Sequence, residues 1–196
     1  MKKSALLVID YQNDLVHPQG IVATKLADTR LEKAQLLAPK IQKLMNGFNT
    51  LGGKIFSIQS DYDIENYNGY YKEKRAQKRY ANTALTGTWG HELYNLVLPE
   101  NSIILEKHYF DAFYETNLDE LLKQNNIEQI FLCGVNTDVC VTHTAIGGAW
   151  RGYHTYLIED LTETVSQNKE QAVEYLARIV DVQLVQSEEV VSLLKG

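Results

Sequence analysis

Three residues of reactive type each follow an apolar run in the sequence. Asp10 ends the run Ala5–Ile9, Lys107 follows the run Ser102–Leu105, and Cys140 closes a polar turn after a later run. A thiolate can attack a carbonyl carbon, a carboxylate can take the thiol proton and pass it to a leaving amine, and an ammonium can support both anions. Together the three side chains predict acyl transfer.

Each of these residues also has an ordinary interpretation. Asp10 can cap a helix or bond a loop, Lys107 can be a solvated surface lysine, and Cys140 can be a small buried side chain. Convergence of all three on one edge of a sheet favours the catalytic interpretation. The second cysteine, Cys133, lies inside an apolar run, and we assign it no chemistry.

Cys140 immediately precedes the apolar stretch 141–150, which we predict to be a helix. A thiol at a helix N-terminus lies near the positive end of the helix dipole and near backbone N–H groups, so we expect a lowered pKa and a raised thiolate fraction. The same N–H groups can hold the oxyanion of a tetrahedral intermediate. Cys140 is therefore predicted to be an activated nucleophile.

The elements that must position these residues alternate along the chain. The predicted strands are the short apolar runs at 5–9, 54–59, 102–105, 129–135, 154–158 and 182–185. Helical patterns lie between them, and this alternation predicts a three-layer α/β/α, Rossmann-like fold whose parallel sheet is covered on both faces. We find no linker or internal repeat, so residues 1–196 are predicted to be a single domain.

Several predicted helices carry recognisable start signals. The stretch Leu31–Met45 has apolar residues at helical spacing. Asn117 and Asn168 are each followed three residues later by Glu or Gln, as in a capping box. Ser187 precedes two glutamates, which the helix dipole favours in a first turn.

The composition excludes several classes of function. The chain has 196 residues, 44% of them hydrophobic, and a formal net charge of -6, which disfavours binding to a phosphate backbone. No apolar run approaches the ~18 residues of a membrane helix. Two cysteines make no disulfide framework. We therefore expect a cytoplasmic protein with a small-molecule partner, and neither a nucleic acid nor a membrane.

One long segment, residues 60–90, lacks a regular apolar pattern. Its aromatic and basic residues are Tyr62, Tyr67, Tyr70, Tyr71 and Tyr80, with Lys72, Lys74, Arg75, Lys78 and Arg79. Long loops within compact domains are usually functional or form interfaces. We interpret this segment as a lid, a substrate wall or a subunit contact.

Four segments of the sequence resemble the isochorismatase-like cysteine hydrolase superfamily, which includes nicotinamidases, ureidoacrylate and carbamoylsarcosine amidohydrolases, and isochorismatases. They are ALLVIDYQND at 5–14, TGTWGHEL at 86–93, EKHYFDAF at 106–113 and GVNTDVCV at 134–141. The last is the most specific of the four. The segments occur in the expected order and span nearly the whole chain.

The resemblance implies a role for each reactive residue. Asp10 would be the general base, Lys107 would support the aspartate and the thiolate, and Cys140 would form an acyl-enzyme. The Val135–Asn136 peptide bond would be cis, and the N–H groups of Asn136 and Cys140 would form an oxyanion hole. The implied fold is a six-stranded parallel sheet with helices on both sides, usually assembled as a homodimer or homotetramer, and we predict no cofactor.

The sequence departs from the nicotinamidases at their metal site. Nicotinamidases carry an Asp-x-His pair and a further histidine that bind a metal. The matching segment Ser60–Ile64 reads Ser-Asp-Tyr-Asp-Ile, and no histidine lies between His17 and His91. Asp61 and Asp63 can hold a hard cation through oxygen, but an isolated Asp-x-Asp is more often a turn. We therefore predict no metal site and disfavour nicotinamidase activity.

Five side chains outside the turn 134–139, and Asn136 within it, are candidates for substrate contact, each with a structural alternative. Trp89, Tyr109 and Phe113 are possible walls of an apolar pocket or core residues. Asp111 favours a cationic or amide N–H substrate if it faces the pocket, and otherwise caps a helix. His143 lies three residues after the nucleophile and either touches the substrate or packs. The Asn136 side chain likewise reaches the substrate or occupies its turn.

These observations lead to one leading hypothesis and two alternatives. The leading hypothesis is a cysteine hydrolase of a small non-peptide C–N substrate, which is an amide, ureido or N-carbamoyl compound. The first alternative is hydrolysis of a vinyl ether of the isochorismatase type, in which the aspartate acts and the cysteine is dispensable. The second is a non-catalytic protein of the same fold, which the intact set Asp10, Lys107 and Cys140 argues against, or a redox sensor, which is disfavoured because the potential resolving partner Cys133 lies in a predicted strand.

Overall fold

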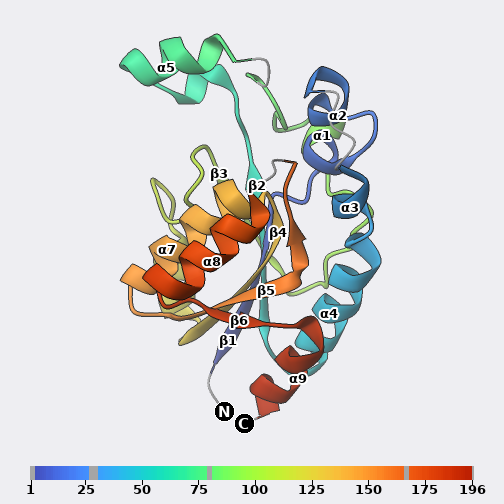
Figure 1. Cartoon of the computed structure of the whole chain (residues 1–196), viewed down its shortest axis with the longest axis vertical. Coiled ribbons are helices and arrows are strands. Elements are labelled where there is room, and N and C mark those ends of the chain that lie inside the picture. The colour runs from blue at the N-terminus through green and yellow to red at the C-terminus, as the bar shows by residue number, and fades with distance from the viewer. Residues whose placement is uncertain (1–2, 27–30, 79–80, 166–167, 196) are drawn as a thin grey trace.

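The computed structural model describes residues 3–26, 31–78, 81–165 and 168–195, and a single six-stranded sheet forms its centre (Figure 1). The strands are β1 (Ser4–Ile9), β2 (Lys54–Ser60), β3 (Ile103–Lys107), β4 (Gln129–Val135), β5 (His154–Glu163) and β6 (Gln183–Val185). All neighbouring strands pair in parallel, in the order β3-β2-β1-β4-β5-β6. The predicted parallel sheet is confirmed, although β5 extends beyond its predicted end at residue 158.

Helices cover both faces of the sheet, as the fully buried strand β1 requires. The helices are α3 (Leu31–Gln35), α4 (Ala38–Thr50) and α9 (Ser187–Lys195) on one face, and α6 (Leu118–Gln124), α7 (Thr142–Trp150) and α8 (Lys169–Ile179) on the other. Leu6 and Val8 belong to the core under the first set, whereas Leu7 and Ile9 belong to the core under the second. Because successive strand residues point to opposite faces, one apolar run supplies both cores.

The connections create a switch point between β1 and β4. From β1 the chain continues to β2 and β3 on one side, then returns to β4 on the other side of β1. In open parallel sheets ligands bind outside the carboxyl ends of the strands at such a point. Asp10 follows β1 and Cys140 follows β4, so the topology brings these two residues together across it.

The stretch Leu31–Met45 forms two helices and not the single helix predicted. Helix α3 ends at Gln35, and α4 starts at Ala38 with Pro39 in its first turn. Proline has no N–H and disfavours helical backbone in the residue before it, so a continuous helix cannot pass this position. Leu36 lies in the break and is 70% exposed.

Residues 60–90 contain ordered elements beyond the carboxyl ends of the strands (Figure 1). They are the 3₁₀ turns η1 (Ile64–Asn66) and η2 (Trp89–His91) and the helix α5 (Gly69–Ala76); the short helices α1 (Asn13–Val16) and α2 (Ile21–Leu26) lie at the same end. Arg79 and Tyr80 of the predicted loop lie outside the described residues. Within the described ranges, no helix is long and apolar enough to cross a membrane.

Gly134 permits the close approach of β4 to β1 at the switch point. Its φ is +114°, and a Cβ atom there would lie 2.1 Å from the carbonyl oxygen of Ile9. Residues other than glycine rarely adopt this conformation. The colliding atoms belong to the Ile9 backbone, which cannot move without disturbing the sheet. The glycine before the nucleophile turn is thus a packing requirement.

We predict that Gly134→Ala lowers the free energy of unfolding by about 3 kcal/mol or more, because strain and a backbone collision add. Gly52→Ala is the matched control, since Gly52 also has a positive φ, +78°, but a Cβ atom there meets nothing within 4 Å. We expect the control to lose about 1 kcal/mol. Urea denaturation measures both, and equal losses would contradict the packing role of Gly134.

Candidate active site

Asp10 lies at the switch point, directly after β1. Its φ is +53°, a left-handed conformation that aspartate tolerates better than most residues, and its backbone N–H donates to the carbonyl of Ile58 at 2.9 Å. The residue is 1% exposed. The carboxylate is therefore held at the base of a buried site and not in a solvated loop.

Lys107 ends β3 and forms a buried ion pair with Asp10. The Lys107 Nζ lies 2.9 Å from Asp10 Oδ2, and the lysine is fully buried. This excludes the alternative that Lys107 is a surface lysine. A buried ion pair requires good geometry and further hydrogen bonds, because both charges lose their hydration.

Ser60 and Tyr62 complete this arrangement, and the sequence analysis assigned neither of them a catalytic role. Ser60 Oγ donates to Asp10 Oδ1 at 2.9 Å and accepts from Lys107 Nζ at 2.8 Å. The Tyr62 hydroxyl lies 3.3 Å from Lys107 Nζ and 3.2 Å from Cys140 Sγ. The role of Ser60 follows from its position, because it is the last residue of β2 and β2 lies between β1 and β3.

Cys140 lies in a π-helical turn, η3 (Thr137–Val141), immediately before α7. The residue is 4% exposed. Burial raises the pKa of the Cys140 thiol to about 12, and the nearby Asp10 carboxylate adds to the rise, while Lys107 opposes it. The predicted low pKa is therefore wrong, because desolvation outweighs the favourable ammonium. At neutral pH the sulfur keeps its proton.

The charge of Lys107 is retained despite its burial. Burial by itself lowers the pKa of Lys107, but the Asp10 carboxylate and the Cys140 sulfur outweigh burial and raise that pKa above its ordinary value. Tyr62 remains neutral, since burial and the nearby Cys140 and Asp10 hold its pKa well above the usual range. Near neutral pH the site thus contains an ammonium beside a neutral phenol and a neutral thiol.

The turn that carries Cys140 has the backbone that the family resemblance implied. The Val135–Asn136 peptide bond is cis. The Asn136 side chain accepts a hydrogen bond from the backbone N–H of Val165 at 3.2 Å, and Asn136 also lines a cavity. The asparagine therefore ties the turn to the segment after β5.

A cavity of about 330 Å³ opens onto these residues. It is lined by Asp10, Leu15, Val22, Tyr62, Arg75, Thr83, Phe110, Asn136, Val139, Cys140 and Val165. Its size is at the small end of ligand pockets, and most of its walls are apolar. The arrangement suits a small substrate whose reactive atom meets the sulfur.

The described residues that line this cavity do not include the five residues predicted to bind the substrate, which are Trp89, Tyr109, Asp111, Phe113 and His143. Trp89 is 45% exposed, and its ring meets that of His17 edge-on at 4.8 Å. His143 is exposed, and its Nδ1 lies 2.7 Å from the carbonyl oxygen of Val139, one helical turn earlier. These two predictions are corrected, because the Trp89 ring packs against the ring of His17 and the His143 ring contacts the backbone of its own helical turn.

The other three candidates lie in the segment after β3. Asp111 Oδ1 accepts from the backbone N–H of Phe113 at 2.9 Å, so the aspartate closes a turn and does not cap a helix as the predicted alternative had it. Phe113 is buried and stacks on Tyr153 at 6.1 Å. The carbonyl oxygen of Tyr109 accepts from Lys107 Nζ at 3.1 Å, so this residue supports the site through its backbone. Among the described residues, the aromatic side chains that line the cavity are Tyr62 and Phe110.

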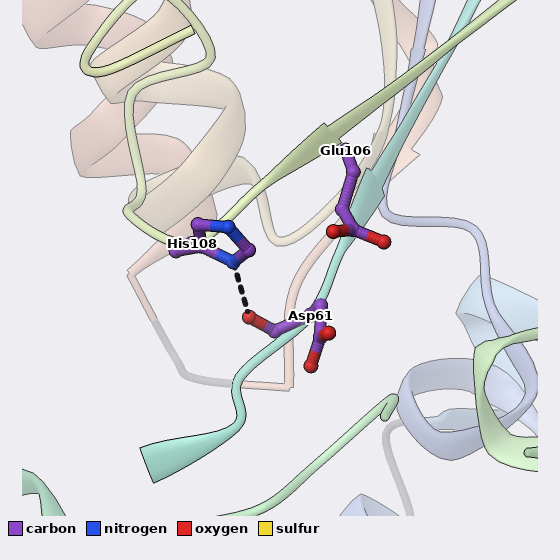
Figure 2. Close-up of side chains that lie close together, drawn as sticks. All are labelled: Asp61, Glu106 and His108. Atoms are coloured by element: carbon purple, nitrogen blue, oxygen red, sulfur yellow. Dashed lines mark hydrogen bonds between the residues drawn. The ribbon is translucent and has the colours of Figure 1, made fainter. Parts of the chain in front are cut away.

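One group of described residues has the composition of a metal site. Asp61, Glu106 and His108 each offer a ligand atom, and these atoms lie within 4.8 Å of one another. Figure 2 shows the three side chains together, with His108 Nδ1 at 3.0 Å from the carbonyl oxygen of Asp61. Glu106 and His108 flank Lys107 in sequence, so the group lies on the other side of that chain segment from the lysine. Asp63 is not a member and instead accepts from Glu65 N at the start of η1.

A parallel α/β sheet thus brings a carboxylate, an ammonium and a thiol together beside a small cavity, an arrangement that suits a hydrolase. A family model for the isochorismatase domain matches residues 4–187. The chain belongs to the isochorismatase family.

Known proteins show the same relationship. An isochorismatase family protein of Bacillus subtilis, PncA, is 30% identical over 173 residues, covering 84% of this chain and 88% of that protein. N-carbamoylsarcosine amidase from Thermoplasma acidophilum is 26% identical with a TM-score of 0.76, covering 95% and 97% of the two chains. The pyrazinamidase of Pyrococcus horikoshii, in complex with zinc, is 24% identical with a TM-score of 0.79, covering 94% and 99%, which is a likeness of fold.

The raised thiol pKa predicts how Cys140 reacts with iodoacetamide. We expect the alkylation rate to rise about tenfold per pH unit from pH 7 to 10, because the thiolate fraction keeps growing below a pKa of about 12. Asp10→Asn should speed alkylation at pH 7, since the carboxylate holds the proton on sulfur. Asp61→Asn is the matched control and should leave the rate unchanged. Mass spectrometry of the Cys140 peptide measures the rate, and slower alkylation in Asp10→Asn would contradict this electrostatic picture.

The buried ion pair predicts a large effect of Lys107→Met on stability. We expect a loss of about 3–5 kcal/mol in the free energy of unfolding at pH 7, because Asp10 stays buried without its counter-charge. Adding Asp10→Asn should restore part of the loss. Lys123→Met breaks the exposed pair with Asp119, 2.6 Å, and should cost no more than about 0.5 kcal/mol. Similar losses for the two lysine variants in chemical denaturation would refute the buried-pair assignment.

Proposed function

We propose that this protein hydrolyses an amide, ureido or N-carbamoyl bond of a small molecule through Cys140, Asp10 and Lys107. The observation that carries the proposal is the continuous contact from the Asp10–Lys107 pair through Tyr62 to the sulfur of Cys140. Asp10, Asn136 and Cys140 line the same small cavity. The family relationship and the 26% identity to an N-carbamoylsarcosine amidase support a C–N substrate.

The first half of the reaction forms an acyl-enzyme. Cys140 is a neutral thiol at rest, so its proton must leave as the sulfur attacks the substrate carbonyl carbon. Asp10 takes that proton, and the carbonyl oxygen becomes an oxyanion held by the N–H groups of Asn136 and Cys140. When the intermediate collapses, the C–N bond breaks and Asp10 gives the proton to the leaving nitrogen. A thioester on Cys140 and free ammonia or an amine result.

The second half of the reaction uses water in the same way. Asp10 takes a proton from water, and the resulting hydroxide attacks the thioester carbon. The second tetrahedral intermediate breaks its C–S bond, and the proton on Asp10 passes to the departing sulfur of Cys140. The product acid leaves and the resting thiol is restored.

Lys107 and Ser60 set the orientation and charge that this cycle requires. The lysine ammonium binds one carboxylate oxygen of Asp10 and the serine hydroxyl binds the other, so the carboxylate cannot rotate freely. The ammonium also balances the negative charge that the proton transfer leaves on sulfur. The Tyr62 hydroxyl contacts both Lys107 Nζ and Cys140 Sγ, so it lies between the ammonium and the sulfur.

We predict that Cys140→Ala abolishes ammonia release, with at least about a 10⁴-fold loss of turnover, because no acyl-enzyme can form. The assay measures ammonia across a panel of amides, ureido compounds and N-carbamoyl compounds. Cys133→Ala is the matched control, since that cysteine is buried within β4 and should leave turnover within about threefold of the parent.

Asp10→Asn separates this mechanism from hydrolysis of a vinyl ether. In the amidase mechanism both Asp10→Asn and Cys140→Ala lose turnover. A Cys140→Ala enzyme that stays active while Asp10→Asn is inactive would replace the amidase proposal with the vinyl ether alternative. Full activity in both variants would remove the mechanism altogether.

A further inference from the structure

The hydroxyl of Tyr62 lies between a cation and the nucleophile. It is 3.3 Å from Lys107 Nζ and 3.2 Å from Cys140 Sγ, and Tyr62 is 5% exposed. Tyr62 follows Ser60, the last residue of β2, by two positions, and side chains two residues apart in extended backbone point to the same side. The chain direction that brings Ser60 to the ion pair thus also brings the tyrosine to the sulfur.

Contacts around the side chain restrict the position of this hydroxyl. The Tyr62 N–H donates to the carbonyl oxygen of Thr83, and the Tyr62 carbonyl oxygen accepts from the N–H of Asn82, both at 3.1 Å. The ring centre is 4.4 Å from the guanidinium carbon of Arg75 and 6.3 Å from the ring centre of Phe110. The hydroxyl is therefore held in place in advance and needs no rearrangement during a reaction.

The contact with Lys107 determines where the phenol proton points. An ammonium group has only donors, so Lys107 donates to the phenol oxygen. Burial and the nearby Cys140 and Asp10 hold the pKa of Tyr62 well above its usual range, so the phenol keeps its single proton. Because its oxygen already accepts from Lys107, the phenol directs this proton toward the sulfur of Cys140.

A donor in this position acts more strongly on a charged sulfur than on a neutral one. Hydrogen bonds to an ionised acceptor are shorter and stronger than those to a neutral acceptor. Burial and the Asp10 carboxylate raise the pKa of the Cys140 thiol, whereas Lys107 and the hydrogen bond from Tyr62 lower it. The phenol therefore favours the states in which the sulfur is negative, and an interaction that strengthens only as the reaction proceeds accelerates it.

We infer that Tyr62 is a catalytic residue whose hydroxyl donates a hydrogen bond to the sulfur of Cys140 while negative charge develops there. The inference rests on the proposed function for the two steps in which that charge arises. In the first step Asp10 removes the thiol proton as the sulfur attacks the carbonyl carbon. In the second step the C–S bond of the tetrahedral intermediate breaks, its electron pair goes to the sulfur, and Asp10 returns the proton. Tyr62 keeps its own proton in both steps.

Alkylation of Cys140 by iodoacetamide tests this donor without any substrate. Tyr62→Phe removes the hydroxyl and keeps the ring that packs against Arg75. We expect the thiolate fraction at pH 8 to fall about tenfold, as the loss of a hydrogen bond to a charged group implies. The alkylation rate should fall by at least about threefold, because the more basic thiolate that remains is also more nucleophilic. Mass spectrometry of the Cys140 peptide measures the rate.

Two further variants separate the donor from a structural effect. Tyr11→Phe is the matched control, because Tyr11 is fully buried, donates to the carbonyl oxygen of Ala34 at 2.5 Å, and is not among the described residues that line the cavity. Its alkylation rate should stay within about twofold of the parent. Replacement of Tyr62 by 3-fluorotyrosine keeps the shape and makes the phenol a stronger donor, so alkylation should be at least as fast as in the parent.

Turnover tests whether the hydrogen bond to the sulfur acts in catalysis. The substrate is the compound that releases ammonia fastest in the panel of amides, ureido compounds and N-carbamoyl compounds. We expect Tyr62→Phe to lower kcat and kcat/KM equally, by about 10- to 100-fold, with KM unchanged, because the interaction belongs to the transition state. Tyr11→Phe should keep the kcat of the parent.

Several results would overturn the inference. They are alkylation in Tyr62→Phe that is as fast as in the parent, slower alkylation in the 3-fluorotyrosine protein than in the parent, or a loss of kcat that is equal in Tyr62→Phe and Tyr11→Phe. Slower alkylation in Tyr62→Phe with unchanged kcat would also reject the catalytic role. If the parent releases no ammonia from any compound while Tyr62→Phe still slows alkylation, the proposed amidase function fails and the hydrogen bond from Tyr62 to the sulfur is confirmed.

Discussion

The buried ion pair between Asp10 and Lys107 is the interaction on which the rest of the site depends. Asp10 directly follows β1 and Lys107 is the last residue of β3. Because β2 lies between these two strands, the ion pair is formed across the end of β2. Ser60 at the end of β2 fills the gap and binds both partners. Because hydration is lost, any shift of these strands leaves a charge without its partner. The register of these strands therefore determines whether the buried charges of the site are balanced.

That constraint also determines the state of the nucleophile. A thiol in this buried position faces the Asp10 carboxylate as well as the Lys107 ammonium, and its pKa rises to about 12. In the mechanism that we propose, proton transfer therefore accompanies the attack of the sulfur. Asp10, which disfavours the resting thiolate, is the group that we propose accepts the proton.

The cavity walls come from segments outside the sheet, and these decide what can bind. Helix α5 lies beyond the carboxyl ends of the strands (Figure 1). The Arg75 guanidinium of this helix packs over the Tyr62 ring. Tyr62 therefore has two roles, since its hydroxyl contacts Cys140 and its ring carries the cation. The long Tyr-rich segment is thus tied to the chemistry through one side chain. Its position makes the interpretation as a substrate wall the best supported of the three.

The sequence by itself determined the parallel sheet and the reactive trio, because continuous apolar runs and the residues that end them are local features. Strand order was not local, so Ser60, which lies between the pair only once β2 is placed between β1 and β3, was assigned no role. The thiol pKa was predicted in the wrong direction because burial is a property of the packed molecule. The pocket walls were missed for the same reason. Side chains such as Arg75 and Phe110 reach the cavity through long-range packing that no spacing in the sequence records.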